Sequence, residues 1–419
     1  MNFIISNLGN YFPYLLFIKN MKGSLFSIFI LLSLPVFPET KTAEVSFFNK
    51  KILVFYDSSI VLDYPYRPND DGYFELYYER MDATLYEVLL KDLQAQKQDL
   101  HLNDWLYFLL LKNSVNVIFA PQKEYMQNLF LWFMLNKSGY ETRLEFKGKV
   151  ITISVFTNDL VYGVPQSKGK GGYYVDLTSF GNEVDYHKWE PFRLNFNPNK
   201  GVETTPFSFV ITQLPKIFES KIMEKEISFT YNGMERKIGI PLDSGYVDFL
   251  KDYPELSVLK HTEITLSPKA YNSLIPYLKE QTSGMDSIKT IRFLMSFCRT
   301  GFKFKKDEVA FAETLYFGGA GQKVIFSPEE SLFNKYVDSE DISTLFYYLA
   351  KEILAPEMIL LKFGKQVSVA VYLHQKIGNP IMYNSKPFAL CDVSESDDTI
   401  EIGQAPKSLA GKTPSFIEK

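Results

Sequence analysis

The chain of 419 residues contains only two cysteines, Cys298 and Cys391. Two cysteines cannot form the set of disulfides that holds a small secreted domain together, and they cannot form a cysteine-rich zinc site. Histidine is nearly as scarce, and no two of the four histidines have the spacing of a metal-binding pair; they are His101, His187, His261 and His374. We therefore expect no metal ion and no cofactor.

The sequence also lacks a concentration of positive charge. Its formal net charge is −4, and lysine and arginine are not gathered on one predicted face. A nucleic-acid partner is not expected, because binding a polyanion calls for a basic patch. The chain is rich in aromatic residues instead, with 36 Phe and 27 Tyr, and these favour strand-rich layers. A chain of this length is expected to form two or three domains.

The stretch MKGSLFSIFILLSLPVFPET begins at Met21 and contains an apolar run from Leu25 to Val36. That run suits a secretory signal peptide and is short for a membrane-spanning helix of about 20 residues. We expect residues 1–40 to be a signal region whose true start is Met21, and the mature protein to be secreted or periplasmic, without a membrane span. The alternative is an uncleaved anchor, and the translation of residues 1–20 stays open.

Alternation and helical spacing predict an α+β fold for the rest of the chain. Strands are expected at 45–56, 72–79 and within 141–178, and helices at 83–97, 104–112, 122–137 and within 267–300. Residues 205–260 are predicted to form a separate β-rich layer, with a hairpin turn at YNG. The expected units are a first α+β unit at 41–195, a β-rich middle domain at 196–264, a second α+β unit at 265–403 and a tail at 404–419.

Two stretches 216 positions apart carry the same pattern. LFLWFMLNKSGYETRLEFKGKVITISVF, from residue 129, corresponds to LFYYLAKEILAPEMILLKFGKQVSVAVY, from residue 345. The same offset relates Gly148 to Gly364 and Asp176 to Asp392. Both copies predict a helix, a strand, a tight glycine turn, a second strand and a further strand that ends in Asp. We interpret the pattern as an internal duplication; the alternative is two unrelated helix-and-hairpin units.

The second copy would bring three points of the chain together. They are the helix start DSED (338–341), the strand GKQVSVAVYL (364–373) and the strand FALCD (388–392). This layout is typical of papain-like and transglutaminase-like nucleophile sites. The helix N-terminus lowers the pKa of a thiol, the next strand supplies a histidine base, and the third supplies an aspartate that orients the imidazole.

These stretches resemble the bacterial transglutaminase-like family. VDSED, GKQVSVAV and FALCDVS resemble its GDCED helix start, its GH-V-AV strand and its Y-x-x-CDPT strand, and VIFSPEESLFNKY resembles its approach to the nucleophile. The resemblance covers about residues 265–403 and extends more weakly to the first copy. It implies two transglutaminase-like units, of papain-like fold, on either side of the middle domain. It also implies that active members are Cys-His-Asp peptidases or transglutaminases.

Carried over residue by residue, the family's triad is degenerate. The nucleophile position is Ser339 rather than Cys, the base position is Gln366 rather than His, and only Asp392 matches. A serine hydroxyl needs a base to become nucleophilic, and an amide side chain does not take up a proton at neutral pH. In the first copy the corresponding residues are Lys123 and Val150, with Asp176 retained. Neither copy is expected to be catalytic.

Each of these residues also has an ordinary structural explanation. Asp338 or Ser339 is a good helix N-cap, Gln366 could satisfy a buried partner, and Asp392 is a common turn former at the end of a strand. Cys391 should face away from Asp392 across the sheet, because neighbouring side chains alternate along a strand.

Two further features are candidate sites. His374 lies eight residues beyond Gln366, about 25 Å along an extended strand, which makes it a poor replacement base. The acidic run SESDDTIE (394–401) is expected to be a solvated loop, with calcium binding as the alternative.

These observations predict a secreted pseudoenzyme that keeps the cleft as a peptide- or protein-binding surface of the cell envelope. One alternative is a serine-dependent hydrolase that uses Ser339, and another is a purely structural envelope scaffold. A cleft filled by Phe and Tyr side chains would favour the scaffold, whereas a groove beside Ser339 would favour binding.

Overall fold

The computed structural model describes residues 39–63, 71–147, 150–180, 192–193, 196–304 and 325–417. All of them belong to one compact unit, Pro38–Lys419. The expected signal region, up to residue 38, lies outside the described residues, and so does His187.

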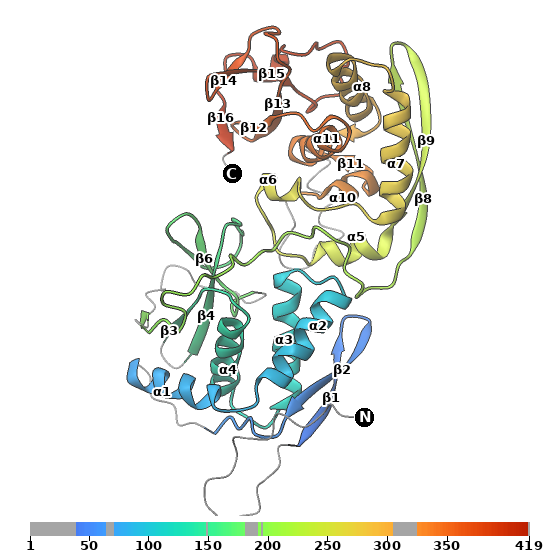
Figure 1. Cartoon of the computed structure of the whole chain (residues 1–419). Coiled ribbons are helices and arrows are strands. Elements are labelled where there is room, and N and C mark those ends of the chain that lie inside the picture. Colours follow the sequence, from blue (N-terminus) through green and yellow to red (C-terminus); the bar gives the residue numbers. More distant parts are fainter. Residues whose placement is uncertain are drawn as a thin grey trace, which may run out of the picture. The chain divides into compact units, whose positions relative to one another are not determined.

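In the first half, the described residues form a hairpin, a group of helices and a five-stranded sheet (Figure 1). The hairpin consists of β1 (Thr40–Phe47) and β2 (Lys50–Asp57), and the helices are α1 (Asp71–Asp82), α2 (Glu87–Asp99), α3 (Asp104–Ile118) and α4 (Glu124–Lys137). The sheet strands are β3 (Thr142–Lys147), β4 (Val150–Thr157), β5 (Gln166–Lys168), β6 (Tyr173–Asp176) and β7 (Phe192–Arg193). Their order in the sheet is β5-β6-β4-β3-β7, and all neighbours are antiparallel.

The second half also begins with a hairpin and ends with a five-stranded sheet (Figure 1). The hairpin consists of β8 (Ile222–Tyr231) and β9 (Met234–Asp243), and the helices are α5 (Ser244–Lys251), α6 (Val258–His261), α7 (Pro268–Gln281), α8 (Ser287–Thr300), α10 (Pro328–Phe333) and α11 (Ser339–Leu354). Two short strands, β10 (Lys303–Phe304) and β11 (Tyr336–Val337), pair in parallel. The sheet strands are β12 (Met358–Phe363), β13 (Gln366–Tyr372), β14 (Ile381–Tyr383), β15 (Lys386–Cys391) and β16 (Ser415–Ile417), and a 3₁₀ turn, η2 (Lys407–Leu409), precedes β16.

The two halves share one plan. The second sheet has the order β14-β15-β13-β12-β16, which matches the first sheet strand for strand, and it is also antiparallel throughout. In the first half β1 packs on α3 and β2 packs on α2, while in the second half β8 packs on α8 and β9 packs on α7. Helix α4 packs on β3 and β4, as α11 packs on β13. The correspondence extends from the first hairpin to the last strand.

The register of the two sheets supports the 216-residue offset. The turn of the β3–β4 hairpin follows the pair Lys147–Val150, and that of the β12–β13 hairpin follows the pair Phe363–Gln366. Both members of the second pair lie 216 positions after those of the first. The predicted helix and two strands are therefore confirmed in both copies, and the glycine turn is confirmed in the second; Gly148 of the first copy lies outside the described residues.

The offset is smaller before the last helix of each half. Phe47 and Tyr231, which end the first strands of the two opening hairpins, lie 184 positions apart. Asn103 and Asp286, the N-caps of α3 and α8, lie 183 positions apart. The second half therefore has about 33 additional residues between α8 and α11, in the region that contains β10, α10 and β11.

Helix α1 corrects the strand predicted at 72–79. Its sequence DGYFELYYERMD is rich in aromatic residues, which suggested a strand. The buried side chains nevertheless recur at helical spacing, at Tyr73, Phe74, Tyr77 and Met81. The burial pattern, rather than the residue types, decides the secondary structure here.

The segment FSFVITQLP (207–215), which the predicted β-rich layer at 205–260 takes as a strand, is an irregular segment with buried side chains. Its first residue bonds to β4, where the Phe207 N–H donates to the Phe156 carbonyl at 2.9 Å, but the next two backbone donors bind carboxylates. The Ser208 N–H donates to Asp104 Oδ2 at 2.9 Å, and the Phe209 N–H donates to Asp159 Oδ2 at 2.7 Å. The strand prediction is wrong because two carboxylates replace the partner strand that an apolar run of this kind usually needs.

The region predicted as a β-rich middle layer contributes to two hydrophobic clusters. Its hairpin β8–β9 buries Ile227, Phe229 and Ile240 with the helices and sheet of the second half. The preceding irregular segment buries Phe207 and Phe209 with the helices and sheet of the first half. Similarly, the segment expected to be a tail adds β16 to the edge of the second sheet, where it pairs with β12.

The structure is α+β, with helices packed on antiparallel sheets, as the sequence predicted. None of the helices in the described ranges is long and apolar enough to cross a lipid bilayer.

Candidate functional site

Ser339 is the first residue of α11, and Asp338 caps the helix. The Asp338 side chain accepts a hydrogen bond from the Asp341 N–H, and the Asp341 side chain accepts one from the Asp338 N–H, both at 3.1 Å. This reciprocal capping box satisfies two of the free donors at the helix start. The capping box alone accounts for the sequence DSED, as expected for an ordinary helix start.

The Ser339 hydroxyl has two polar neighbours. It donates a hydrogen bond to Glu340 Oε2 at 3.1 Å and accepts one from the Val367 N–H at 3.3 Å. Burial raises the pKa of the Glu340 carboxyl, and the nearby Asp338 carboxylate raises it further, while the hydrogen bond from Ser339 opposes the rise. Ser339 thus contacts a carboxylate that sequence reasoning did not identify as its partner.

Gln366 begins β13, as predicted, but its side chain points to a different partner. Its Oε1 accepts a hydrogen bond from Lys412 Nζ at 3.2 Å, near the surface. Among the described residues, Gln366 makes no hydrogen bond with Ser339 or with Asp392. In the described part of the chain, no hydrogen bond therefore joins the Gln366 side chain to either of the other two triad positions.

Asp392 is buried, and its partner on β13 is Ser368. The ladder pairs Val369 with Cys391, which places Ser368 opposite Asp392, and the Ser368 hydroxyl donates to Asp392 Oδ2. The other carboxylate oxygen accepts hydrogen bonds from the Ser394 N–H at 3.1 Å and hydroxyl at 2.8 Å. The expected strand-end turn is thus confirmed. Ser368 was missed because the sequence does not reveal the register between these strands.

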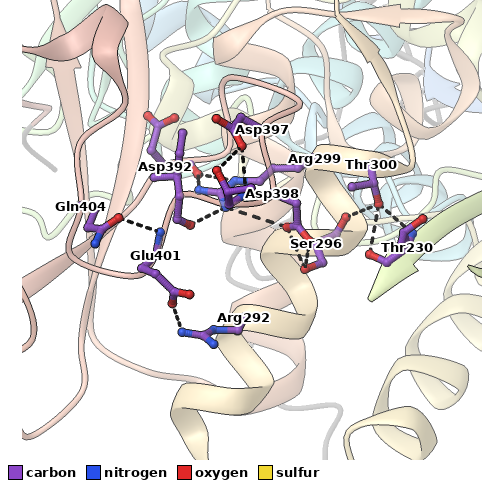
Figure 2. Close-up of polar contacts among 12 residues, drawn as sticks. Thr230, Arg292, Ser296, Arg299, Thr300, Asp392, Asp397, Asp398, Glu401 and Gln404 are labelled. Atoms are coloured by element: carbon purple, nitrogen blue, oxygen red, sulfur yellow. Dashed lines mark hydrogen bonds and ion pairs between the residues drawn. The ribbon is translucent and has the colours of Figure 1, made fainter. Parts of the chain in front are cut away.

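Arg299 on α8 fixes the main chain at Asp392 (Figure 2). Its guanidinium is 2% exposed and donates from Nε at 3.0 Å, and also from Nη2, to the Asp392 carbonyl. A further bond runs from Nη1 to the Ile400 carbonyl at 2.7 Å. One buried side chain therefore holds both the start and the end of the acidic loop.

The acidic loop is also held by other side chains of α8. The Ser296 hydroxyl contacts both Asp398 oxygens, at 2.9 and 3.0 Å, and Arg292 forms an ion pair with Glu401 (Figure 2). Within the described ranges, no group of three or more His, Cys, Asp or Glu side chains could hold a metal ion. The loop is thus anchored to a helix by serine and arginine side chains.

The first copy places its corresponding residues differently. Lys123 is the N-cap of α4 and makes no side-chain capping bond, and Val150 begins β4. Asp176 accepts hydrogen bonds from the Thr178 N–H at 2.8 Å and hydroxyl at 2.5 Å, so it forms the same local turn as Asp392. The register pairs Asp176 with Ser154, so the residue opposite Asp176 is a hydroxyl and not a base.

The remaining candidate nucleophile and base lie away from Ser339. Cys391 is buried in the core on the face opposite Asp392, as expected, and burial raises the pKa of its thiol to about 12. Cys298 is also a buried free thiol. The His374 ring lies 4.6 Å from that of Tyr372, at an angle of 58°, and makes no hydrogen bond with Ser339. Neither cysteine nor this histidine completes a catalytic group.

A cavity of about 990 Å³ borders the candidate site. Glu340 and Val367, the two residues that contact the Ser339 hydroxyl, both line it. Its other walls come from the tip of the β5–β6 hairpin, the segment 255–260 and the edge strand β16. Tyr162, which is 46% exposed, also lines the cavity.

Backbone hydrogen bonds join the cavity walls. The Tyr162 N–H donates to the Glu255 carbonyl at 2.8 Å, and the Ser257 N–H donates to the Leu160 carbonyl at 3.1 Å. These bonds flank an isolated antiparallel bridge. Two of the segments that line the cavity are therefore held together by backbone hydrogen bonds.

Comparison with known proteins leaves the chain without a match: no family model, no curated protein and no solved structure is similar to it.

Proposed function

We propose that this protein is a secreted, non-catalytic pseudoenzyme of the cell envelope, built from two degenerate transglutaminase-like units, and that it binds a peptide or protein segment. The observation that carries the proposal is the cavity of about 990 Å³ beside Ser339. It accompanies a site in which the family's cysteine and histidine positions are Ser339 and Gln366. A cavity beside a site that lacks the reacting groups fits binding better than catalysis.

The shared plan of the two halves supports the proposed units. In each half a helix, a hairpin and a further antiparallel strand ending in Asp follow one another, which is the arrangement that the family resemblance implies. The hairpin β8–β9 corresponds to β1–β2, because β8 and β9 pack on α8 and α7 as β1 and β2 pack on α3 and α2. We therefore assign this hairpin to the second unit, and no middle domain is needed in this proposal.

The serine hydrolase remains a second candidate because Glu340 lies at 3.1 Å from the Ser339 hydroxyl. A carboxylate with a raised pKa could serve as a general base. Against this, the Val367 N–H donates to the same serine oxygen, which lowers its electron density. Among the described residues no histidine accompanies the pair.

The scaffold alternative is less well supported. It was tied to a cleft filled by Phe and Tyr side chains, and the aromatic residues of this region, Tyr162 and Tyr173, line a cavity instead. Exposed aromatic side chains beside a cavity are typical of binding surfaces.

Hydrolysis and binding assays on the purified chain separate these candidates. We expect no hydrolysis of p-nitrophenyl esters or of peptide amides above background, and no difference between wild type and Ser339→Ala. Hydrolysis that disappears in both Ser339→Ala and Glu340→Gln, with a rate that rises with pH through the Glu340 titration, would establish the hydrolase instead. A peptide array that yields no ligand for wild type would contradict the binding proposal.

A further inference from the structure

The charges on the cavity wall are unequally matched, and we infer from them that the ligand of this cavity is an acidic peptide segment. The inference rests on the proposed binding function and names its ligand class. Three lysines line the cavity: Lys168, Lys260 and Lys362. Two carboxylates line it as well, Glu255 and Glu340.

Lys260 is already neutralised by its surroundings. Its Nζ lies 3.3 Å from Asp159 Oδ1 and 3.3 Å from Glu263 Oε2. Lys168 and Lys362 differ, because neither amino group forms an ion pair with a carboxylate among the described residues, although the charge of Lys362 acts on Glu340 and lowers the pKa of that carboxyl. Both lysines are exposed, yet both line the cavity. The cavity therefore presents two cations that no ion pair within the described ranges holds in place, and the charge of Lys362 is partly balanced by Glu340.

The two lining carboxylates are engaged within the protein. Glu340 accepts the Ser339 hydrogen bond, and burial disfavours its charged form. Glu255 Oε1 accepts a hydrogen bond from the Ile325 N–H at 3.2 Å and lies 3.7 Å from His261 Nε2. Burial thus disfavours the charged form of Glu340, and the residues that line the cavity include three lysines against these two carboxylates.

Lys168 and Lys362 are placed by defined backbone rather than by long loops. Lys168 ends β5 and pairs with Tyr173 across the β5–β6 hairpin. The turn between them needs glycine, because Gly171 has a φ of +85° and a Cβ on Gly172 would lie 2.4 Å from the Thr157 carbonyl oxygen. Lys362 lies on β12 between two paired strands. Fixed stems of this kind reduce the entropy lost when a lysine side chain is ordered by a ligand.

The chain offers matched controls for both lysines. Lys170 lies in the same hairpin turn as Lys168, and Lys365 lies in the turn that follows β12, but neither lines the cavity. Replacing either control by Glu changes the net charge by the same amount as Lys168→Glu or Lys362→Glu. A general effect of net charge would appear in all four variants, whereas a cavity effect would appear in two.

The experiment measures fluorescence anisotropy of three labelled peptides of equal length, one rich in Glu, one rich in Lys and one uncharged, against the full chain. We expect the acidic peptide to bind about tenfold or more tightly than the others. Lys168→Glu and Lys362→Glu should each weaken it about tenfold, and added salt should weaken it further. Lys170→Glu and Lys365→Glu should change affinity by less than about threefold.

The outcomes distinguish this inference from the proposed function. Equal binding of all three peptides, or equal effects of the cavity and control variants, would overturn the acidic ligand and leave peptide binding intact. Preference for the Lys-rich peptide would overturn it as well, since Glu255 and Glu340 would then provide the recognition. No binding of any of the three peptides would refute the acidic ligand and, together with an empty array, the proposed function.

Discussion

Replacing Arg299 by Met should destabilise the fold strongly. The guanidinium is 2% exposed and donates three hydrogen bonds, two to the Asp392 carbonyl and one to the Ile400 carbonyl. Methionine keeps much of the side-chain volume but leaves both carbonyls without these donors. A hydrogen bond to a charged group contributes roughly 1.5–3 kcal/mol, and a buried unpaired carbonyl costs about 1–3 kcal/mol. Because the terms overlap, we expect a loss of about 3–5 kcal/mol in the free energy of unfolding.

Arg292→Met is the control for Arg299→Met, since both arginines lie on α8 and hold the same loop (Figure 2). Arg292 and its partner Glu401 are 47% and 48% exposed, and exposed ion pairs contribute about 0–1 kcal/mol. Urea unfolding followed by tryptophan fluorescence gives both free energies. If the two variants lose the same free energy within about 0.5 kcal/mol, a buried guanidinium does not hold this loop.

The other predictions concern buried titratable groups. Glu329 accepts hydrogen bonds from three donors and burial raises its pKa. Its protonated form therefore favours the folded state: this contribution is complete below the unfolded pKa and is lost as pH rises through the folded pKa. The free energy of unfolding of wild type, measured with urea, should therefore fall relative to that of Glu329→Gln between pH 4 and pH 7. A difference between the two proteins that does not change with pH would contradict this prediction. Burial lowers the pKa of Lys225 to about 8, so the folded state loses this proton first. The free energy of unfolding of wild type should thus rise between about pH 8 and the pKa of Lys225 in the unfolded chain. The rise should be smaller in Lys225→Met, and urea titration at each pH measures both. Cys298 and Cys391 are buried thiols with raised pKa values, so they should react with a disulfide reagent only in denaturant; fast reaction of the native protein would show that the core opens.

Local signals in the sequence predicted the elements around the candidate site. The acidic start of α11 and the glycine turn between β12 and β13 involve neighbours in the chain, so their residues identify them. Aromatic-rich α1 misled the prediction because residue type and spacing disagree there, and spacing decides which side chains are buried. The buried strand-like segment at 207–215 was misassigned because its partners, Asp104 and Asp159, come from distant parts of the sequence.

Other long-range contacts could not be predicted either, because their partners are also distant in the sequence. Nothing in SIKTIRFLMSFCRT distinguishes Arg299, which is buried, from Arg292, which is half exposed. The contact of Glu340 with Ser339 could have been considered, because the two residues are adjacent. The cavity could not, because its walls come from segments separated by more than 200 residues.

The register of the third strand decides how far the duplication can carry a functional residue. The hairpins of the two sheets match at an offset of 216, but Asp176 pairs with Ser154 whereas Asp392 lies opposite Ser368. Ser154 and Ser368 are 214 positions apart, so the third strand is displaced by two residues relative to its hairpin. An alignment with one constant offset of 216 residues therefore superposes the two aspartate turns, but it does not superpose the serines that lie opposite the aspartates. If the family's base position is the residue opposite Asp392, it is Ser368 rather than Gln366. Neither side chain can take up a proton at neutral pH, so the proposal of a non-catalytic site does not depend on which alignment is correct.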